Sequence, residues 1–233
     1  MNGKLYVIGT PIGNLGDITY RAVETLNKIE TLVCEDTRVT ARLINYYQEL
    51  GMIESKPRYF AYNEYNENRV SPQIIEMLEG GMQVGLVSDA GMPTLSDPGY
   101  RVIKSAFDKN IEVEIIPGPT ALTTALAWSG MGGENMLYLG FLPKTSGKAN
   151  KILESAKILM ESMKSVRVVL YVSPHRVVKE LKMIKEVMGE VKVVILREMT
   201  KKFQERVEMN ASELIEKYEK QKPKGEMVVV LQK

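Results

Sequence analysis

Cysteine and histidine are almost absent from this sequence. Among 233 residues, Cys34 and His175 are the only members of their types, which excludes an internal disulfide and argues against a cysteine or histidine metal site. No apolar run reaches the length of a membrane span, and the first residues lack a signal-peptide pattern. We therefore expect a cytoplasmic protein that holds no metal and does not enter a membrane.

A strong excess of charge of one sign is also absent. The chain has 31 basic and 29 acidic residues, a formal net charge of +2. It therefore lacks the large excess of basic residues found in proteins that bind nucleic acid by charge alone. A local basic patch remains compatible with this value. Apolar residues make up 44% of the chain, and its length suffices for one large domain or two small ones with a substantial core.

Strand and helix patterns alternate along the chain, which is typical of an α/β protein. A change in pattern near residues 117–120 marks the start of a second strand–helix series, so we expect two α/β domains, residues 1–117 and 118–233. A helix is expected from Gln73 to Leu78, after a polar loop at residues 63–69. The clearest strand patterns are residues 5–8, 32–34, 58–62, 84–87, 112–116 and 166–171.

Residues 85–99 form the most distinctive stretch. A short apolar run ends at Ser88, and two acidic turns follow, at Asp89 and Asp97, each interrupted by glycine and proline. Ligands of open α/β sheets bind at the carboxyl ends of the strands, and these turns contain more Gly and Pro than a plain connection needs. We predict that the loop forms a wall of a binding site.

Other predicted strands end in similar turns, at residues 9–16, 35–38 and 117–121. Their recurrence favours one shared cleft at the carboxyl ends of the strands. The glycine-rich stretch at residues 9–16 matches neither the Gly-x-Gly-x-x-Gly pattern nor the Gly-Lys-Ser/Thr pattern, so the sequence gives no support for a pyrophosphate site.

Seven segments, taken in order, resemble the motifs of the tetrapyrrole-methylase fold family. Glu-Asp-Thr-Arg at 35–38 and Ser-Asp-Ala-Gly at 88–91 are similar to motifs of its methyltransferases of small-subunit ribosomal RNA. The resemblance covers essentially the whole chain. The matching segments are residues 9–19, 35–38, 88–99, 117–121, 140–143, 173–176 and 224–226.

The resemblance implies a fold of two α/β domains with a cofactor cleft between them, distinct from the Rossmann methyltransferase fold. It implies 2′-O-methylation of a cytidine in the decoding region of 16S ribosomal RNA, with S-adenosyl-L-methionine as donor. The implied partners are the small ribosomal subunit and a second copy of the chain in a homodimer. The positions that match the family's donor-binding residues are Pro11, Ile12, Asp89, Met92, Thr120, Ala121, Tyr171, Arg197, Met199 and Gly225.

A ribose hydroxyl is a poor nucleophile until its proton is removed or its developing charge is stabilised. Each candidate for these roles has an alternative as a surface ion pair or a helix cap. Lysines 144, 148, 201 and 202 and Arg206 are candidates for phosphate contacts, with a solvated surface as the alternative. The candidate bases are Glu35, Asp36, Glu67 and Glu198, and the candidate electrostatic partners are Arg38, Arg176 and Lys201.

Two other functions are compatible with parts of the sequence. One keeps the fold and methylates a tetrapyrrole or the diphthamide precursor, although the motifs at 35–38 and 173–176 argue against it. The other is a ribosome-binding protein without catalysis, which would not need to retain Asp89. Binding of the methyl donor distinguishes the ribosome-binding protein from both kinds of methyltransferase.

Overall fold

The computed structural model describes residues 3–233, which form two compact units. The first unit ends at Thr120 and the second spans Ala121–Lys233, whereas the sequence placed the division after residue 117. Among the helices of residues 3–233, none combines the length and the hydrophobicity that a membrane span requires.

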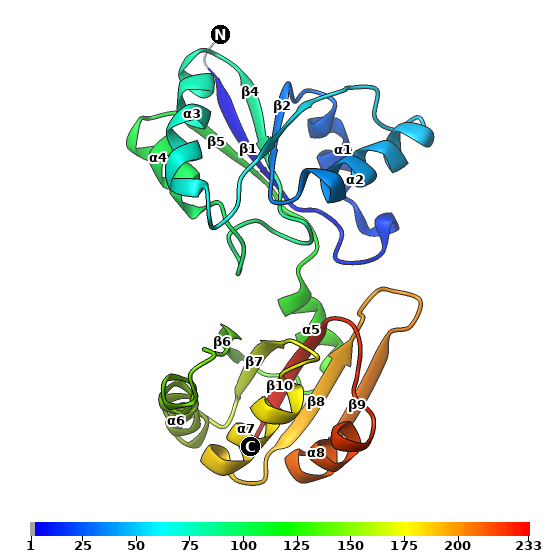
Figure 1. Cartoon of the computed structure of the whole chain (residues 1–233), viewed down its shortest axis with the longest axis vertical. Helices are drawn as coiled ribbons and strands as arrows, with labels where there is room; N and C mark the ends of the chain where they lie inside the picture. The colour runs from blue at the N-terminus through cyan, green and yellow to red at the C-terminus, as the bar shows by residue number, and fades with distance from the viewer. Residues whose placement is uncertain (1–2) are drawn as a thin grey trace. The chain divides into compact units, whose positions relative to one another are not determined.

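The first unit contains a five-stranded parallel sheet with the order β3-β2-β4-β1-β5 (Figure 1). Because every neighbouring pair is parallel, all five carboxyl ends lie at one edge of the sheet. The five strand patterns that the sequence shows in this region are thereby confirmed. The strands are β1 (Lys4–Ile8), β2 (Thr31–Cys34), β3 (Arg58–Ala61), β4 (Gln83–Leu86) and β5 (Glu112–Ile116).

Helices cover both faces of this sheet. The helices α1 (Tyr20–Leu26) and α2 (Thr37–Glu49) pack on one face, and α3 (Glu67–Glu79) and α4 (Tyr100–Asp108) pack on the other (Figure 1). A single turn of 3₁₀ helix, η1 (Leu15–Asp17), precedes α1. The result is a doubly wound α/β unit.

The start of α3 differs from the prediction. The helix begins at Glu67, whereas the sequence indicated a polar loop at residues 63–69 and a helix from Gln73. The Asn66 side chain accepts a hydrogen bond from the Asn63 backbone N–H at 2.8 Å and donates one to the Ala61 carbonyl oxygen at 3.0 Å. These bonds fold residues 63–66 into a turn that leads directly into the helix.

The second unit contains a mixed five-stranded sheet, with the order β6-β7-β10-β8-β9. Only β6 and β7 are parallel to each other. The predicted strand at residues 166–171 is confirmed as β7. The strands are β6 (Asn135–Phe141), β7 (Val166–Val172), β8 (Lys192–Arg197), β9 (Glu205–Asn210) and β10 (Met227–Gln232).

Three helices share one core with the inward side chains of the second sheet: α6 (Ser146–Ser162), α7 (Val177–Met188) and α8 (Ala211–Lys220). The helix α5 (Ala121–Ser129) contacts β8 and β10. Each unit therefore has its own hydrophobic core, and the loops that follow its strands carry the residues predicted to act on ligands.

Candidate active site

Two loops meet at the carboxyl edge of the first sheet. The backbone N–H of Thr10, after β1, donates to the Gly91 carbonyl oxygen at 2.9 Å, and the N–H of Gly91, after β4, donates to the Thr10 carbonyl oxygen at 3.2 Å. The Thr10 hydroxyl also donates to the Ser88 carbonyl oxygen at 3.3 Å. The loops after β1 and β4 are thus joined, as the recurrence of their turns predicts.

Bare backbone surrounds this junction. A Cβ atom on Gly9 would lie 2.7 Å from the Cα of Gly118 and 2.6 Å from the Sδ of Met92. A Cβ on Gly118 would in turn lie 2.9 Å from the Cα of Gly9. Any side chain at either position would therefore separate the ends of β1 and β5, and only two glycines permit this approach.

The loop after β4 is held in an uncommon conformation. Thr94 and Ser96 have φ angles of 76° and 68°, and Gly91 has a φ of 84°. A β-branched residue such as Thr94 rarely adopts positive φ, and such strain is found most often at functional sites. The backbone geometry agrees with the prediction that this loop is more than a connection.

Three carboxylates gather at these strand ends: Glu35, Asp89 and Asp97. Burial, together with the negative charges of Glu35 and Asp89, raises the pKa of Asp97 to about 7. Burial likewise raises the pKa of Glu35, again with help from Asp89. Within residues 3–233, none of the three forms an ion pair with a basic side chain. The unit thus concentrates partly buried negative charge that no direct ion pair neutralises, although the charge of Arg38 acts on Asp89 from a distance.

Asp89 also anchors the start of α2. Its Oδ1 accepts a hydrogen bond from the Asp36 backbone N–H at 3.0 Å, and burial raises its pKa. Asp97 lies in the second acidic turn, and the sequence does not identify it as a site residue, since a Ser-Asp-Pro-Gly turn alone does not show which carboxylates lie near it. Within the part of the chain that the structure describes, no three His, Cys, Asp or Glu side chains, these carboxylates included, lie close enough together to hold a metal ion.

Asp36 and Arg38 form the helix cap and the surface ion pair that the sequence analysis gave as alternatives to a catalytic role. Asp36 caps α2, because its Oδ1 accepts a hydrogen bond from the Arg38 backbone N–H at 2.9 Å. The Arg38 guanidinium lies 2.6 Å from Asp36 Oδ2, and these bonds hold the pKa of Asp36 well below its usual range. Arg38 itself is exposed.

The remaining predicted residues of the first unit lie in the same loops, except one. Pro11 and Ile12 follow the Thr10–Gly91 pair, and a Cβ on Gly91 would lie 3.4 Å from Ile12 Cγ2. Thr120 is the last residue of the unit and Ala121 begins α5. Glu67 instead pairs with Arg101, with 2.8 Å between Oε1 and Nε.

In the second unit, Glu198 is bound to the loop before β10. Its backbone N–H donates to the Glu226 carbonyl oxygen at 2.9 Å, and its Oε1 accepts from the Glu226 backbone N–H at 2.9 Å. Lys201 Nζ lies 3.1 Å from Glu198 Oε1 and 2.6 Å from Glu226 Oε2. Burial raises the pKa of Glu198, but the Glu226 N–H and Lys201 outweigh it and lower the pKa overall.

Gly225 makes room for this arrangement. Its φ is 88°, and a Cβ there would lie 2.5 Å from Cδ of Glu198. Arg197 ends β8, pairs with Glu205 at 2.8 Å and donates to the Lys224 carbonyl oxygen at 3.2 Å. Met199 is buried. The predicted residues at 197–201 and Gly225 therefore form one local structure.

Tyr171 lies near the end of β7, and Arg176 directly precedes α7. The Tyr171 ring packs edge-on against Phe141, with centroids 5.6 Å apart. The Arg176 guanidinium donates to the Leu142 carbonyl oxygen at 2.7 Å and lies 2.8 Å from Oε1 of Glu180. Glu180 is 1% exposed. These contacts make Arg176 a link between α7 and the loop after β6.

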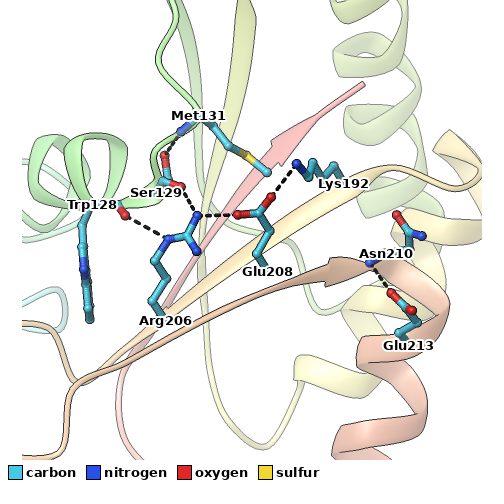
Figure 2. Close-up of polar contacts among 8 residues, drawn as sticks. All are labelled: Trp128, Ser129, Met131, Lys192, Arg206, Glu208, Asn210 and Glu213. Carbon is cyan, nitrogen blue, oxygen red and sulfur yellow. Dashed lines mark hydrogen bonds and ion pairs between the residues drawn. The ribbon is translucent and has the colours of Figure 1, made fainter.

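The side chain of Arg206, a candidate for phosphate contact, forms hydrogen bonds and an ion pair within the protein. It donates to the Trp128 and Ser129 carbonyl oxygens at 3.2 and 2.6 Å, and its Nη2 lies 2.5 Å from Oε2 of Glu208 (Figure 2). These bonds satisfy carbonyl groups at the end of α5, which lack partners within the helix. Arg206 therefore attaches β9 to α5.

Comparison with known proteins shows the family. Residues 4–215 match the Tetrapyrrole (Corrin/Porphyrin) Methylases. The chain is 43% identical over 230 residues to a ribosomal RNA small subunit methyltransferase I from Thermotoga maritima, covering 98% of each protein. It is 35% identical to the enzyme of that name from Bacillus subtilis, covering 99% of this chain and 75% of the relative.

A solved structure shares the fold. The uroporphyrin-III C-methyl transferase from Thermus thermophilus, complexed with S-adenyl homocysteine, superimposes with a TM-score of 0.65. The alignment covers 99% of this chain and 98% of that one, at 14% identity. The prediction of an α/β, tetrapyrrole-methylase-like fold is confirmed.

Proposed function

Since the chain belongs to the tetrapyrrole methylase family, and aligns over nearly its whole length with small-subunit ribosomal RNA methyltransferases, we propose that it methylates the ribose 2′-hydroxyl of a cytidine in 16S ribosomal RNA. The methyl donor is S-adenosyl-L-methionine. The observation that carries the proposal is the set of unpaired carboxylates Glu35, Asp89 and Asp97 beside bare backbone at the strand ends.

The chemistry of these residues fits the donor. S-adenosylmethionine carries a positive sulfonium and a positive ammonium group, whereas the three carboxylates repel one another and form no ion pair among the described residues. A cation bound nearby would relieve that repulsion. The close approach of Gly9 and Gly118 keeps side chains away from the ends of β1 and β5, beside these carboxylates.

Several predicted donor contacts remain proposals. In the first unit they are Pro11, Ile12, Asp89, Met92 and Thr120. The second unit contributes a set that the structure holds firmly in place, since Gly225 packs on Glu198 and Met199 is buried. The proposed contacts of the second unit are Ala121, Tyr171, Arg197, Met199 and Gly225.

Glu35 is the proposed proton acceptor. The bound donor supplies an electrophilic methyl group, and the hydroxyl proton must leave as its oxygen forms the new bond to carbon. Burial and Asp89 raise the pKa of Glu35, which makes its carboxylate a stronger base. The other candidates are less suited: Asp36 and Glu198 have lowered pKa values, and Glu67 pairs with Arg101.

The electrostatic candidates have different proposed roles. Arg38 is exposed at the start of α2 but bound to the Asp36 carboxylate, so its proposed role is to hold the Asp36 cap in place. Arg176 and Lys201 are positioning residues, because each ties a loop of the second unit in place. We further propose that the protein works as a homodimer in the cytoplasm, where its ribosomal acceptor is found.

A transfer assay tests the proposal. Purified protein is incubated with labelled S-adenosylmethionine and small subunits that lack the modification, and the ribosomal RNA is mapped by mass spectrometry. The expected product is one cytidine methylated on its ribose. Methylation of a base, or of a tetrapyrrole with none of the subunit, would contradict the proposal. Folded protein that fails to bind the donor would indicate a ribosome-binding protein without catalysis.

A further inference from the structure

Formal charge is divided unequally between the two units. Residues 1–120 carry 16 acidic and 11 basic side chains, a net charge of −5, whereas residues 121–233 carry 13 acidic and 20 basic side chains, a net charge of +7. The small net charge of the whole chain conceals this difference. RNA phosphates are therefore attracted to the second unit and repelled by the first.

Nine of the 20 basic side chains of the second unit form ion pairs with acidic side chains. Lys182 pairs with Glu219, Lys185 with Glu190, and Lys201 with Glu198 and Glu226. Such pairs contribute little to the field that a phosphate would experience. A phosphate-binding surface must be sought where lysines lack carboxylate partners.

Lys144, Lys148 and Lys179 meet that condition. All three are exposed, and within residues 3–233 none forms an ion pair with a carboxylate. Lys144 follows β6, Lys148 lies in the first turn of α6, and Lys179 lies in the first turn of α7. Lys179 Nζ donates to the Lys144 carbonyl oxygen at 3.4 Å, so the three belong to one surface.

The position of Lys148 is unfavourable for the helix itself. The first turn of α6 contains no acidic residue, although helices prefer acidic side chains there and disfavour basic ones. The carboxylate beside this surface, that of Glu180, is buried and paired with Arg176. On α6, the first acidic residue is Glu154, two turns beyond Lys148.

An exposed aromatic ring borders these lysines. Phe141 ends β6, is 54% exposed, and rests edge-on against Tyr171. Arg176 holds the loop between Phe141 and Lys144 by donating to the Leu142 and Pro143 carbonyl oxygens at 2.7 and 3.2 Å. Basic side chains beside an exposed aromatic ring are typical of proteins that bind unpaired nucleotides.

We propose that the surface made by Phe141, Lys144, Lys148 and Lys179 binds the ribosomal RNA acceptor, with the lysines on its phosphates and Phe141 stacked on an unpaired base. This assignment rests on the proposed function, because it identifies where that function's acceptor is held. It also separates Lys144 and Lys148 from Lys201 and Arg206, whose charges are used within the protein.

A matched pair of variants tests the assignment. Lys144→Ala/Lys148→Ala removes two unpaired lysines, and Lys182→Ala/Lys185→Ala removes two paired lysines from the same unit. Binding to small subunits that lack the modification is measured over a range of salt concentrations. We expect the first variant to bind about tenfold more weakly at physiological salt, with a salt slope lower by roughly 1.5, since each phosphate contact contributes about 0.7–0.9.

The control variant should bind within about twofold of the wild type, because exposed ion pairs contribute little. Phe141→Ala should weaken binding by about 5–100-fold and leave the salt slope unchanged, since stacking contributes roughly 1–3 kcal/mol per base. Donor affinity, measured by calorimetry with S-adenosylmethionine, should stay unchanged in both lysine variants.

The assignment is overturned if Lys144→Ala/Lys148→Ala binds subunits like the wild type, or if the control loses as much affinity. It is also overturned if the variant changes the oligomeric state instead, because the surface would then be an interface between copies. Its failure is distinct from that of the proposed function. If wild-type protein methylates subunits while these variants bind normally, only the assignment is wrong; if wild-type protein does not methylate subunits, the proposed function fails.

Discussion

Asp97 in the first unit and Glu180 in the second both have a pKa raised to about 7, but their surroundings differ. Burial raises both values. Glu35 and Asp89 then add negative charge beside Asp97, whereas Arg176 and Lys179 place positive charge near Glu180 and oppose the rise. The first unit thus places carboxylates near one another without an ion pair, whereas the second unit places positive side chains beside its buried carboxylate.

The largest effect is expected at Glu35. Glu35→Gln removes the proposed proton acceptor without changing its shape, so turnover on small subunits should fall about 10²–10⁴-fold, the usual contribution of general base catalysis. Steady-state methyl transfer measures this loss. The matched control is Glu67→Gln, which removes a carboxylate paired with Arg101. If Glu67→Gln abolishes turnover and Glu35→Gln does not, the assignment of the base is wrong.

A smaller effect is expected at Asp89. Asp89→Ala removes a carboxylate that also accepts the Asp36 N–H, so donor affinity should fall by about 1–3 kcal/mol, the cost of losing a charged hydrogen-bond partner. Calorimetry with S-adenosylmethionine measures it. Asp108→Ala, which removes an exposed carboxylate paired with Lys104, is the control. Equal donor affinity in both variants would show that Asp89 has only a structural role.

The smallest effect is expected at Glu180, where the comparison predicts pH-dependent stability. A carboxyl group whose pKa rises from 4.5 to about 7 on folding stabilises the protein below pH 4.5, and this contribution is lost as the pH rises through 7. In Glu180→Gln the side chain cannot ionise. The free energy of unfolding should therefore fall less between pH 5 and pH 8 in this variant than in the wild type, by about 1–2 kcal/mol.

Urea unfolding at the two pH values measures this difference for Glu180→Gln and for Glu186→Gln, which changes an exposed glutamate on the same helix. Glu186→Gln should retain the wild-type pH dependence. An equally steep pH dependence in Glu180→Gln would show that the Glu180 carboxylate remains ionised over this range, with Arg176 compensating for its burial.

The sequence predicted the first unit better than the second. Apolar runs that stop at glycine or acidic turns locate the strands of a parallel sheet, because such strands are buried on both faces. In the second unit, β9 was missed, since only Val207 of its residues is buried and the others are polar or exposed. The start of α3 was also missed, because Pro72 inside the helix is an ordinary sign of a helix boundary.

α8 was missed although its pattern is present. Ala211, Leu214 and Tyr218 are buried at helical spacing, and Asn210 with Glu213 forms a capping box. At the site, the motifs identified Asp89 and the glycines, because those depend on local turns. They did not distinguish Glu35 from Asp36, since ion pairing and burial depend on neighbours that only the folded chain reveals.

The charges on β9 have a consequence for aggregation. β9 is an outer strand of the second sheet, and edge strands with unpaired backbone groups can recruit a strand from another molecule. Arg206 and Glu208 occupy one face of β9, bound to α5 and to Lys192 of β8 (Figure 2). A strand added at this edge would lie against fixed charges and would find little apolar surface to bury. The bonds that attach α5 to the sheet therefore also protect the protein against uncontrolled strand pairing when its concentration is high.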